Sequence, residues 1–157
     1  METKLRGGLS AAQAKGAAIG HFNISDVAIL KGVVGAAQVM QTAVIVGVSE
    51  GERTYLGTRQ IAAMIRSLDD EIDVPIFLNA DHTHSLASAL AAAKAGFDSI
   101  VFDLSSLPFE ENVKQTRQAV EALKSINSTI FVEGEIGDIG TGSEIHETAS
   151  ETGADNR

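Results

Sequence analysis

The sequence predicts an α/β fold built around a sheet of parallel strands. Short apolar runs alternate with longer segments of helical period, and the run at 42–49 is almost continuously apolar and β-branched. Five strands that alternate regularly with helices are typical of right-handed crossover connections. In chain order we expect helix 3–15, strand 17–23, helix 26–40, strand 42–49, helix 58–70, strand 76–81, helix 86–95, strand 99–103, helix 109–125 and strand 129–136.

The first three elements follow from period and capping. Residues 3–15 have a weak helical period, and the short apolar run at 17–23 predicts a strand. Ser25 or Asp26 is suited to cap the next helix, whose apolar residues lie roughly on one side as far as Met40. The opening unit therefore reads as helix, strand, helix.

The middle of the chain contains the clearest strand and the clearest amphipathic helix. The run at 42–49 predicts a strand covered on both faces. The polar stretch with Gly51 and Gly57 predicts a loop. The helix that follows, 58–70, is expected to turn four apolar residues inward: Ile61, Met64, Ile65 and Leu68.

The last elements are delimited by proline, serine and glycine. Pro75 opens a strand that runs to Asp81, Ser85 caps an alanine-rich helix, and Gly96 ends that helix as a C-cap glycine. The remaining elements continue the alternation to the fifth strand, 129–136.

Two architectures accommodate this alternation. A doubly wound open sheet can be completed by five strands, whereas a (β/α)₈ barrel typically needs about 250 residues. With 157 residues, the pattern by itself favours the doubly wound sheet. The motifs described below favour a TIM (β/α)₈ barrel family instead, here as a partial barrel of about five parallel strands with four to five helices.

Composition and charge limit the partners. A net charge of −9 without a basic patch argues against nucleic acid and anionic membranes. A phosphorylated substrate remains compatible, because backbone N–H groups bind phosphate without help from overall charge. There is no cysteine, no apolar stretch of the ~20 residues that a membrane span needs, and no signal-peptide pattern, so we expect a cytoplasmic protein.

Polar residues gather at the carboxyl ends of the predicted strands, where α/β folds place functional groups. Helix capping and strand termination explain the same residue types, so a functional site and a structural role both remain open. The residues are His21 and Asn23, Ser49 and Glu50, Asp81 with His82 and His84, Asp103 and Ser105, and Glu133 and Glu135.

Two of these groups have the chemistry of a metal site. A neutral imidazole such as that of His82 is a common metal ligand, and the adjacent carboxylate of Asp81 can act as an acid/base beside it. His84 is expected to point the same way as His82. Glu133 and Glu135 would share one face of the last strand, where like charges repel unless a cation lies between them or solvent screens them.

Six motifs occur in order along the chain: G-H-F-N at 20–23, V-S-E-G at 48–51, L-N-A-D-H-T-H-S at 78–85, A-G-F-D-S-I-V-F-D at 95–103, L-P-F-E-E-N-V at 107–113 and V-E-G-E-I-G at 132–137. In order and spacing they resemble the class II, metal-dependent aldolases that cleave fructose and tagatose bisphosphates. The resemblance implies an eight-stranded barrel whose N-terminal part is 1–146, followed by an irregular tail, 147–157. It also implies the reversible aldol cleavage of a ketose bisphosphate to dihydroxyacetone phosphate and an aldehyde.

The same resemblance implies roles for individual residues. Asp81 would be the catalytic acid/base, and His82 would bind Zn²⁺, or another divalent cation, together with the acidic positions Asp103 and Glu135. The substrate-binding residues it implies are Ser49, near a phosphate, and Asn23, at the floor of the site.

The sequence departs from the family pattern in ways that bear on activity. In the family, two further zinc-binding histidines and the glycine-rich phosphate loops come from strands after the Glu-x-Glu strand. We therefore expect a truncated form with an incomplete zinc site and little activity of its own. Further candidate ligands are His21, His84 and His146.

Two other functional hypotheses accompany the aldolase hypothesis. In one, the chain is a catalytically inactive half-barrel that acts as an assembly or complementation partner through unpaired first and fifth strands, either as a homo-oligomer or with a separately encoded C-terminal half. In the other, the chain is a different metal-dependent lyase on a self-completed five-stranded sheet.

Overall fold

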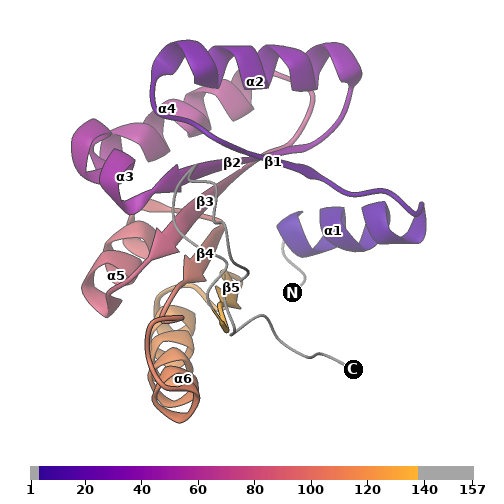
Figure 1. Cartoon of the computed structure of the whole chain (residues 1–157). Coiled ribbons are helices and arrows are strands. Elements are labelled where there is room, and N and C mark those ends of the chain that lie inside the picture. The colour runs from indigo at the N-terminus through magenta and orange to yellow at the C-terminus, as the bar shows by residue number, and fades with distance from the viewer. Residues whose placement is uncertain (1–3, 138–157) are drawn as a thin grey trace, which may run out of the picture.

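The computed structural model of the chain describes residues 4–137, which form one parallel sheet and six helices (Figure 1). The helices are α1 Lys4–Ala14, α2 Val27–Met40, α3 Glu50–Leu56, α4 Thr58–Glu71, α5 Leu86–Ala95 and α6 Phe109–Ile126. The strands are β1 Gly20–Asn23, β2 Val44–Ser49, β3 Ile76–Thr83, β4 Ser99–Phe102 and β5 Phe131–Gly134. Within this part of the chain, no helix is long and apolar enough to cross a bilayer.

The order of the strands decides between the two predicted architectures. All strand pairs are parallel, and the spatial order β1-β2-β3-β4-β5 repeats the order in sequence. A doubly wound sheet reverses its order at a switch point, whereas a barrel adds each strand beside the last. The sheet is therefore the partial barrel that the motifs favour, and the doubly wound alternative is wrong.

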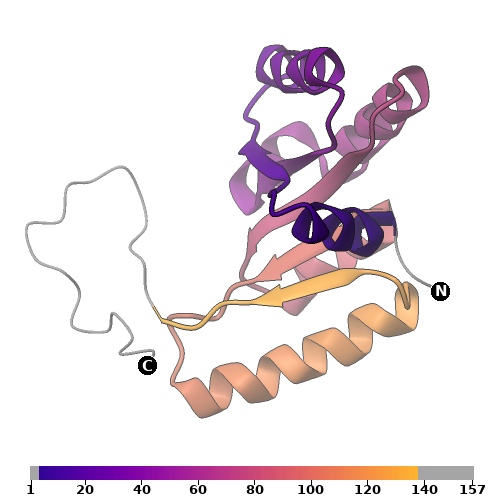
Figure 2. The ribbon, with the colours of Figure 1, turned by 90° about the vertical axis from the view of Figure 1, so that its right-hand side faces the viewer.

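Helices α2 to α6 follow the outside of the curved sheet, and α1 lies apart from them (Figures 1 and 2). The guanidinium of Arg6 on α1 lies 5.8 Å from the centre of the Phe131 ring on β5. Gly8 lies close to the ring of Phe77, so α1 also contacts β3. Helix α1 therefore contacts two strands, β3 and β5, that are distant from it in the sequence.

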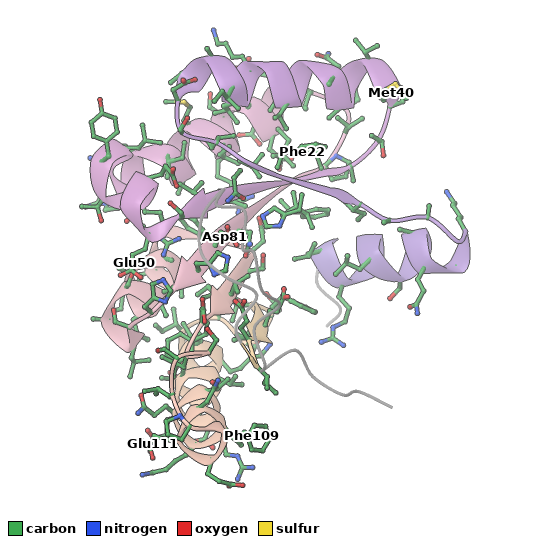
Figure 3. All side chains as sticks on the ribbon, viewed as in Figure 1. Phe22, Met40, Glu50, Asp81, Phe109 and Glu111 are labelled. Carbon is green, nitrogen blue, oxygen red and sulfur yellow. The ribbon has the colours of Figure 1, made fainter. Side chains whose placement is uncertain are left out.

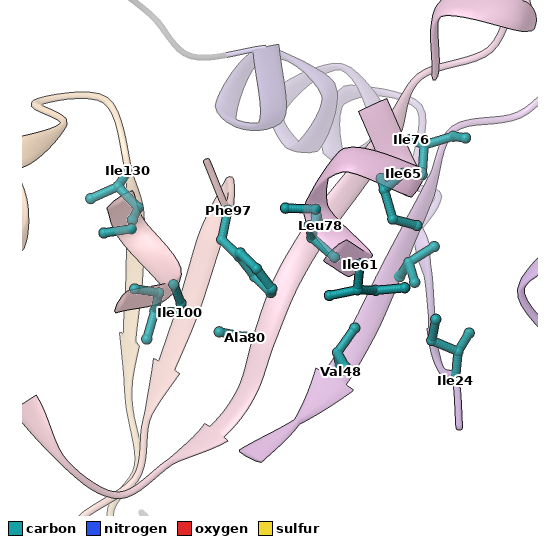
Figure 4. Packing of buried hydrophobic residues seen from close by; sticks show 14 of the residues in the cluster. Ile24, Val48, Ile61, Ile65, Ile76, Leu78, Ala80, Phe97, Ile100 and Ile130 are labelled. Carbon is teal, nitrogen blue, oxygen red and sulfur yellow. The ribbon is translucent and has the colours of Figure 1, made fainter. Parts of the chain in front are cut away.

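The core lies between the sheet and its outer helices (Figure 4). Alternate residues of β2 and β3 point into it, because side chains of a strand alternate between its faces. Small residues of α5, such as Ala89 and Ala92, are fully buried and allow the helix to lie close to the sheet. The strand residues in the core are Val44, Val46, Val48, Ile76, Leu78 and Ala80.

The predicted caps are confirmed. Asp26 caps α2, and its carboxylate accepts the N–H of Ile29 at 2.8 Å. Ser85 caps α5 in the same way, and Gly96 ends that helix with a φ of 94°, in the left-handed region that glycine adopts freely. These helix boundaries are set by local side-chain chemistry.

The loop predicted around Gly51 is wrong, because those residues form α3. The hydroxyl of Ser49 accepts the N–H of Glu52, and the carboxylate of Glu52 accepts the N–H of Ser49. This capping box supports a helix that the single glycine does not prevent. Gly57, with a φ of 86°, then joins α3 to α4, which raises the number of helices above the predicted four to five.

Other differences are smaller. The first and last strands are shorter than predicted, so Glu135 follows β5 instead of lying in it. On α4, Met64 is 36% exposed, and Ala62 takes the buried position beside Ile61. The predicted boundary at residue 146, the tail 147–157 and the candidate ligand His146 lie outside the described residues.

Candidate metal centre

The carboxyl ends of the parallel strands meet at one end of the sheet, and the candidate residues lie there. Asn23 ends β1, Asp81 and His82 lie near the end of β3, Asp103 directly follows β4, and Glu135 closely follows β5. Figure 3 shows Asp81 at this end of the sheet, with Glu50 of α3 on the same side. Residues that are far apart in the sequence are thus neighbours in space because every strand runs the same way.

Three of these residues form a compact set of donor atoms. One ligand atom each from His82, Asp103 and Glu135 lie within 4.8 Å of one another. Nδ1 of His82 is 2.8 Å from Oδ2 of Asp103 and 3.4 Å from Oε2 of Glu135. An imidazole and two carboxylates are a donor set that suits zinc and other divalent cations, so the residues fit such an ion.

The charges of this cluster affect one another. Burial favours the neutral acid of Asp103, but hydrogen bonds from the hydroxyl and N–H of Ser105 and from His82 lower its pKa to about 2. The hydrogen bond to Asp103 raises the pKa of His82, although partial burial opposes the rise. Burial and the negative charge of Asp103 raise the pKa of Glu135. Because a bound cation favours neutral imidazole and ionised carboxylate, binding to this cluster would release protons.

The backbone of His82 has an unusual conformation. Its φ is 40°, in the left-handed region, and the pairing of β3 with β4 changes register between Ala80 and Thr83. A non-glycine residue with positive φ is uncommon and persists only where its surroundings hold it. This local irregularity accompanies the approach of the His82 ring to Asp103.

Asp81 and Asn23 form a second pair next to the cluster. The side-chain amide of Asn23 donates to Oδ2 of Asp81 at 2.7 Å, and Asp81 is 8% exposed. Gly47 on β2 leaves room for this contact, since a Cβ there would lie 2.2 Å from Oδ1 of Asn23. The carboxylate of Asp81 is therefore held in one orientation at the strand ends.

The other predicted residues lie at the same end but outside the cluster. Ser49 is paired in register with Asp81, and its hydroxyl caps α3. His21 has Nε2 3.4 Å from the amide of Asn79, on the inner face of the sheet. The ring of His84 stacks at 6.4 Å from that of His82, but its Nδ1 lies 3.1 Å from the backbone carbonyl of Asp103.

The Glu-x-Glu motif contributes one carboxylate to the cluster. Glu133 is exposed on β5, whereas Glu135 reaches His82. The amide of Asn112 on α6 donates to the backbone carbonyl of Glu135 at 2.8 Å and so holds that segment. Asn112 and Arg53 were not predicted to act near the site, whereas Ser105 was among the predicted strand-end residues and its hydroxyl donates to Asp103. The signal for Asn112 was a polar side chain on the side of a helix that faces the core, because such a residue needs a buried hydrogen-bond partner.

Comparisons with known proteins agree with this arrangement. The family model for fructose-bisphosphate aldolase class-II matches residues 3–156. A fructose-bisphosphate aldolase of Geobacillus stearothermophilus is 38% identical over 126 residues, which are 78% of this chain and 43% of the relative. The 6-phospho-5-dehydro-2-deoxy-D-gluconate aldolase of Shouchella clausii is also 38% identical over 126 residues, 78% of this chain and 42% of the relative.

A solved structure shows the same fold. The crystal structure of the YdjI aldolase from Escherichia coli K12 superposes with a TM-score of 0.78 at 30% identity, over 87% of this chain and 53% of that one. The chain spans less than half the length of the curated relatives named above. The resemblance therefore extends over most of this chain and part of each relative.

Proposed function

Because this chain belongs to the class II fructose-bisphosphate aldolase family, we propose that it carries the acid/base and part of the cation site of a reversible aldol cleavage. The substrate would be a phosphorylated ketose such as fructose 1,6-bisphosphate, cleaved to dihydroxyacetone phosphate and an aldehyde. The observation that carries the proposal is the cluster of His82, Asp103 and Glu135 next to Asp81. Such a role belongs to sugar-phosphate metabolism in the cytoplasm, in keeping with an acidic chain without cysteine.

In this proposal Asp81 moves the proton of the hydroxyl on the cleaved bond. Its carboxylate is nearly buried, and the amide of Asn23 orients it by donating to Oδ2. An oriented carboxylate within hydrogen-bond reach of a substrate hydroxyl is the geometry that general acid–base catalysis needs. Asn23 and Ser49 would contact the substrate, with Ser49 near a phosphate.

His82, Asp103 and Glu135 would hold the divalent cation. Zinc, when bound, supplies Lewis-acid stabilisation of negative charge that develops on a carbonyl oxygen. Asp103 is well suited to this role, because its low pKa keeps it ionised throughout the neutral range. The resemblance implies two further histidine ligands from later strands, so the cluster is the portion of the cation site that these residues can supply.

Calorimetric titration with Zn²⁺ tests the cation site directly. We expect His82→Ala to abolish binding because it removes the imidazole from the cluster. His21→Ala is the matched control, since it removes another imidazole, one whose Nε2 lies 3.4 Å from the side-chain amide of Asn79 and outside the cluster. Equal zinc affinity in wild type and His82→Ala would refute the site. Cleavage of fructose 1,6-bisphosphate, and its loss in Asp81→Ala, would test the acid/base role.

A second candidate function is association through the exposed edge of the sheet. Strand β1 pairs with β2 alone among the described strands, and Phe22 on it is 50% exposed. Phe22 on β1 and Met40 at the end of α2 (Figure 3) line a groove of about 440 Å³ together with Val33 of α2. A homo-oligomer or a separately encoded C-terminal half could cover this edge. A monomer by sedimentation velocity, unaffected by Phe22→Glu, would contradict self-association.

A further inference from the structure

A buried arginine lies behind the carboxyl end of β3. Arg53 on α3 is 2% exposed, although arginine is rarely buried without a partner. Its guanidinium donates to the backbone carbonyl of Val48, to the carbonyl of Asp81 at 3.1 Å and to the hydroxyl of Thr83 at 2.8 Å. All three acceptors belong to the ends of β2 and β3.

The burial of Arg53 is energetically unfavourable unless the charge has partners. Desolvation lowers the pKa of Arg53, and the negative charges of Glu50, Asp81 and Glu52 oppose that shift. A guanidinium stays charged in proteins, so the charge is retained inside the fold. An apolar side chain would pack α3 against the sheet without this desolvation. The hydrogen bonds of Arg53 therefore suggest a role beyond packing.

Two of the three acceptors of Arg53 lie on either side of His82. Asp81 precedes it and Thr83 follows it, while His82 itself has a φ of 40°. The Thr83 hydroxyl also donates to the carbonyl of Ala80 at 3.2 Å, across the place where the strand register shifts. Arg53 and Thr83 thus fix both neighbours of a residue whose backbone conformation needs external support.

We propose that Arg53 is a positioning residue for the cation site. It holds Asp81, His82 and Thr83, the irregular end of β3, in the conformation that aims the His82 ring at Asp103 and Glu135. It touches neither cation nor substrate and acts through the backbone of β3. The inference rests on the proposed function, because a bound cation is what the orientation of His82 serves.

The test measures zinc affinity and thermal unfolding of the whole chain in three variants. Arg53→Met removes the guanidinium, and Thr83→Val keeps Arg53 but removes the hydroxyl that it binds. We expect both to weaken Zn²⁺ binding by calorimetry, by about 10–100-fold as for other residues that orient metal ligands. Arg66→Met is the matched control, because Arg66 binds the carbonyl of Gly96 and Asp98, away from the cation site. We expect it to bind zinc like the wild type.

A second readout separates positioning from stability and from the proposed function. The ring resonances of His82 in the metal-free chain should shift in Arg53→Met and Thr83→Val, and stay in place in Arg66→Met. Unchanged zinc affinity or unchanged His82 resonances in Thr83→Val would overturn the inference, even if Arg53→Met fails to fold. If the wild type binds no zinc, the proposed function fails, and the resonances still decide whether Arg53 positions His82.

Discussion

Replacing Asp103 with asparagine should destabilise the fold at neutral pH by a predictable amount. The carboxylate is nearly buried, and its pKa is lowered from 3.8 to about 2 by hydrogen bonds from Ser105 and His82 that outweigh desolvation. At roughly 1.4 kcal/mol per pKa unit, the ionised form contributes about 2 kcal/mol to the free energy of unfolding. Asp103→Asn keeps the shape and one acceptor oxygen but removes the charge, so it should lose most of this amount.

The sign of the pH dependence follows from the direction of each shift. Because the folded pKa of Asp103 is depressed, its contribution is present above pH 3.8 and disappears as the pH falls towards 2. The pKa of His82 is raised, so the contribution of its protonated form is present below pH 6.5 and disappears as the pH rises through the folded pKa. The difference in the free energy of unfolding between wild type and Asp103→Asn should therefore be largest near pH 5–6.

Urea unfolding with a chelator present, at pH 3, 5.5 and 8, measures this difference without bound metal. Asp70→Asn removes an exposed carboxylate of α4 and is the control that should leave the free energy of unfolding nearly unchanged at each pH. An equal destabilisation by Asp103→Asn at pH 3 and 5.5 would refute the reasoning. So would a destabilisation no larger than that of the control.

Three further substitutions test other contacts. Gly47→Ala would place a Cβ 2.2 Å from Oδ1 of Asn23, so we expect the free energy of unfolding, measured with urea, to fall by about 1–3 kcal/mol. Wild-type stability in this variant would contradict the close approach. Asn112→Ala removes the amide that donates to the carbonyl of Glu135, so it should lower the free energy of unfolding by about 1–3 kcal/mol and weaken Zn²⁺ binding. Unchanged zinc affinity would show that this contact of α6 does not support the cation site. Asp26→Ala removes the cap of α2 and should cost about 1 kcal/mol while leaving zinc affinity unchanged, which calorimetry checks.

The helices and strands were largely predictable because their signals are local. Asp26, Ser85 and Gly96 cap helices through contacts within a few residues, and the sequence places them at those ends. Helix α3 was not predicted, although Ser49 and Glu52 form a capping box, because a polar stretch with two glycines is equally typical of a loop. Strand ends were less predictable, since pairing with a neighbour decides where a strand stops.

The residues of the candidate site were predicted in part, from the family resemblance of their motifs and not from local helix and strand signals. The motifs indicated Asp81, His82, Asp103 and Glu135 through a family resemblance, and the parallel strands bring these residues to one end of the sheet. Their roles in catalysis remain predictions. The side chain of Arg53 reaches acceptors 28 and 30 residues further along the chain, and no local pattern indicates such partners.

The sequence by itself determined the alternation of helices and strands, the apolar faces of the core and the residue types at the strand ends, because each depends on neighbours along the chain. The tertiary structure decided the sequential order of the strands, and with it a partial barrel over a doubly wound sheet. It also decided that His82, with its left-handed backbone, lies next to Asp103 and Glu135, and that the buried Arg53 donates to both neighbours of His82 at the end of β3. These features depend on contacts between segments that are distant in the sequence, and such contacts form only when the whole sheet is assembled.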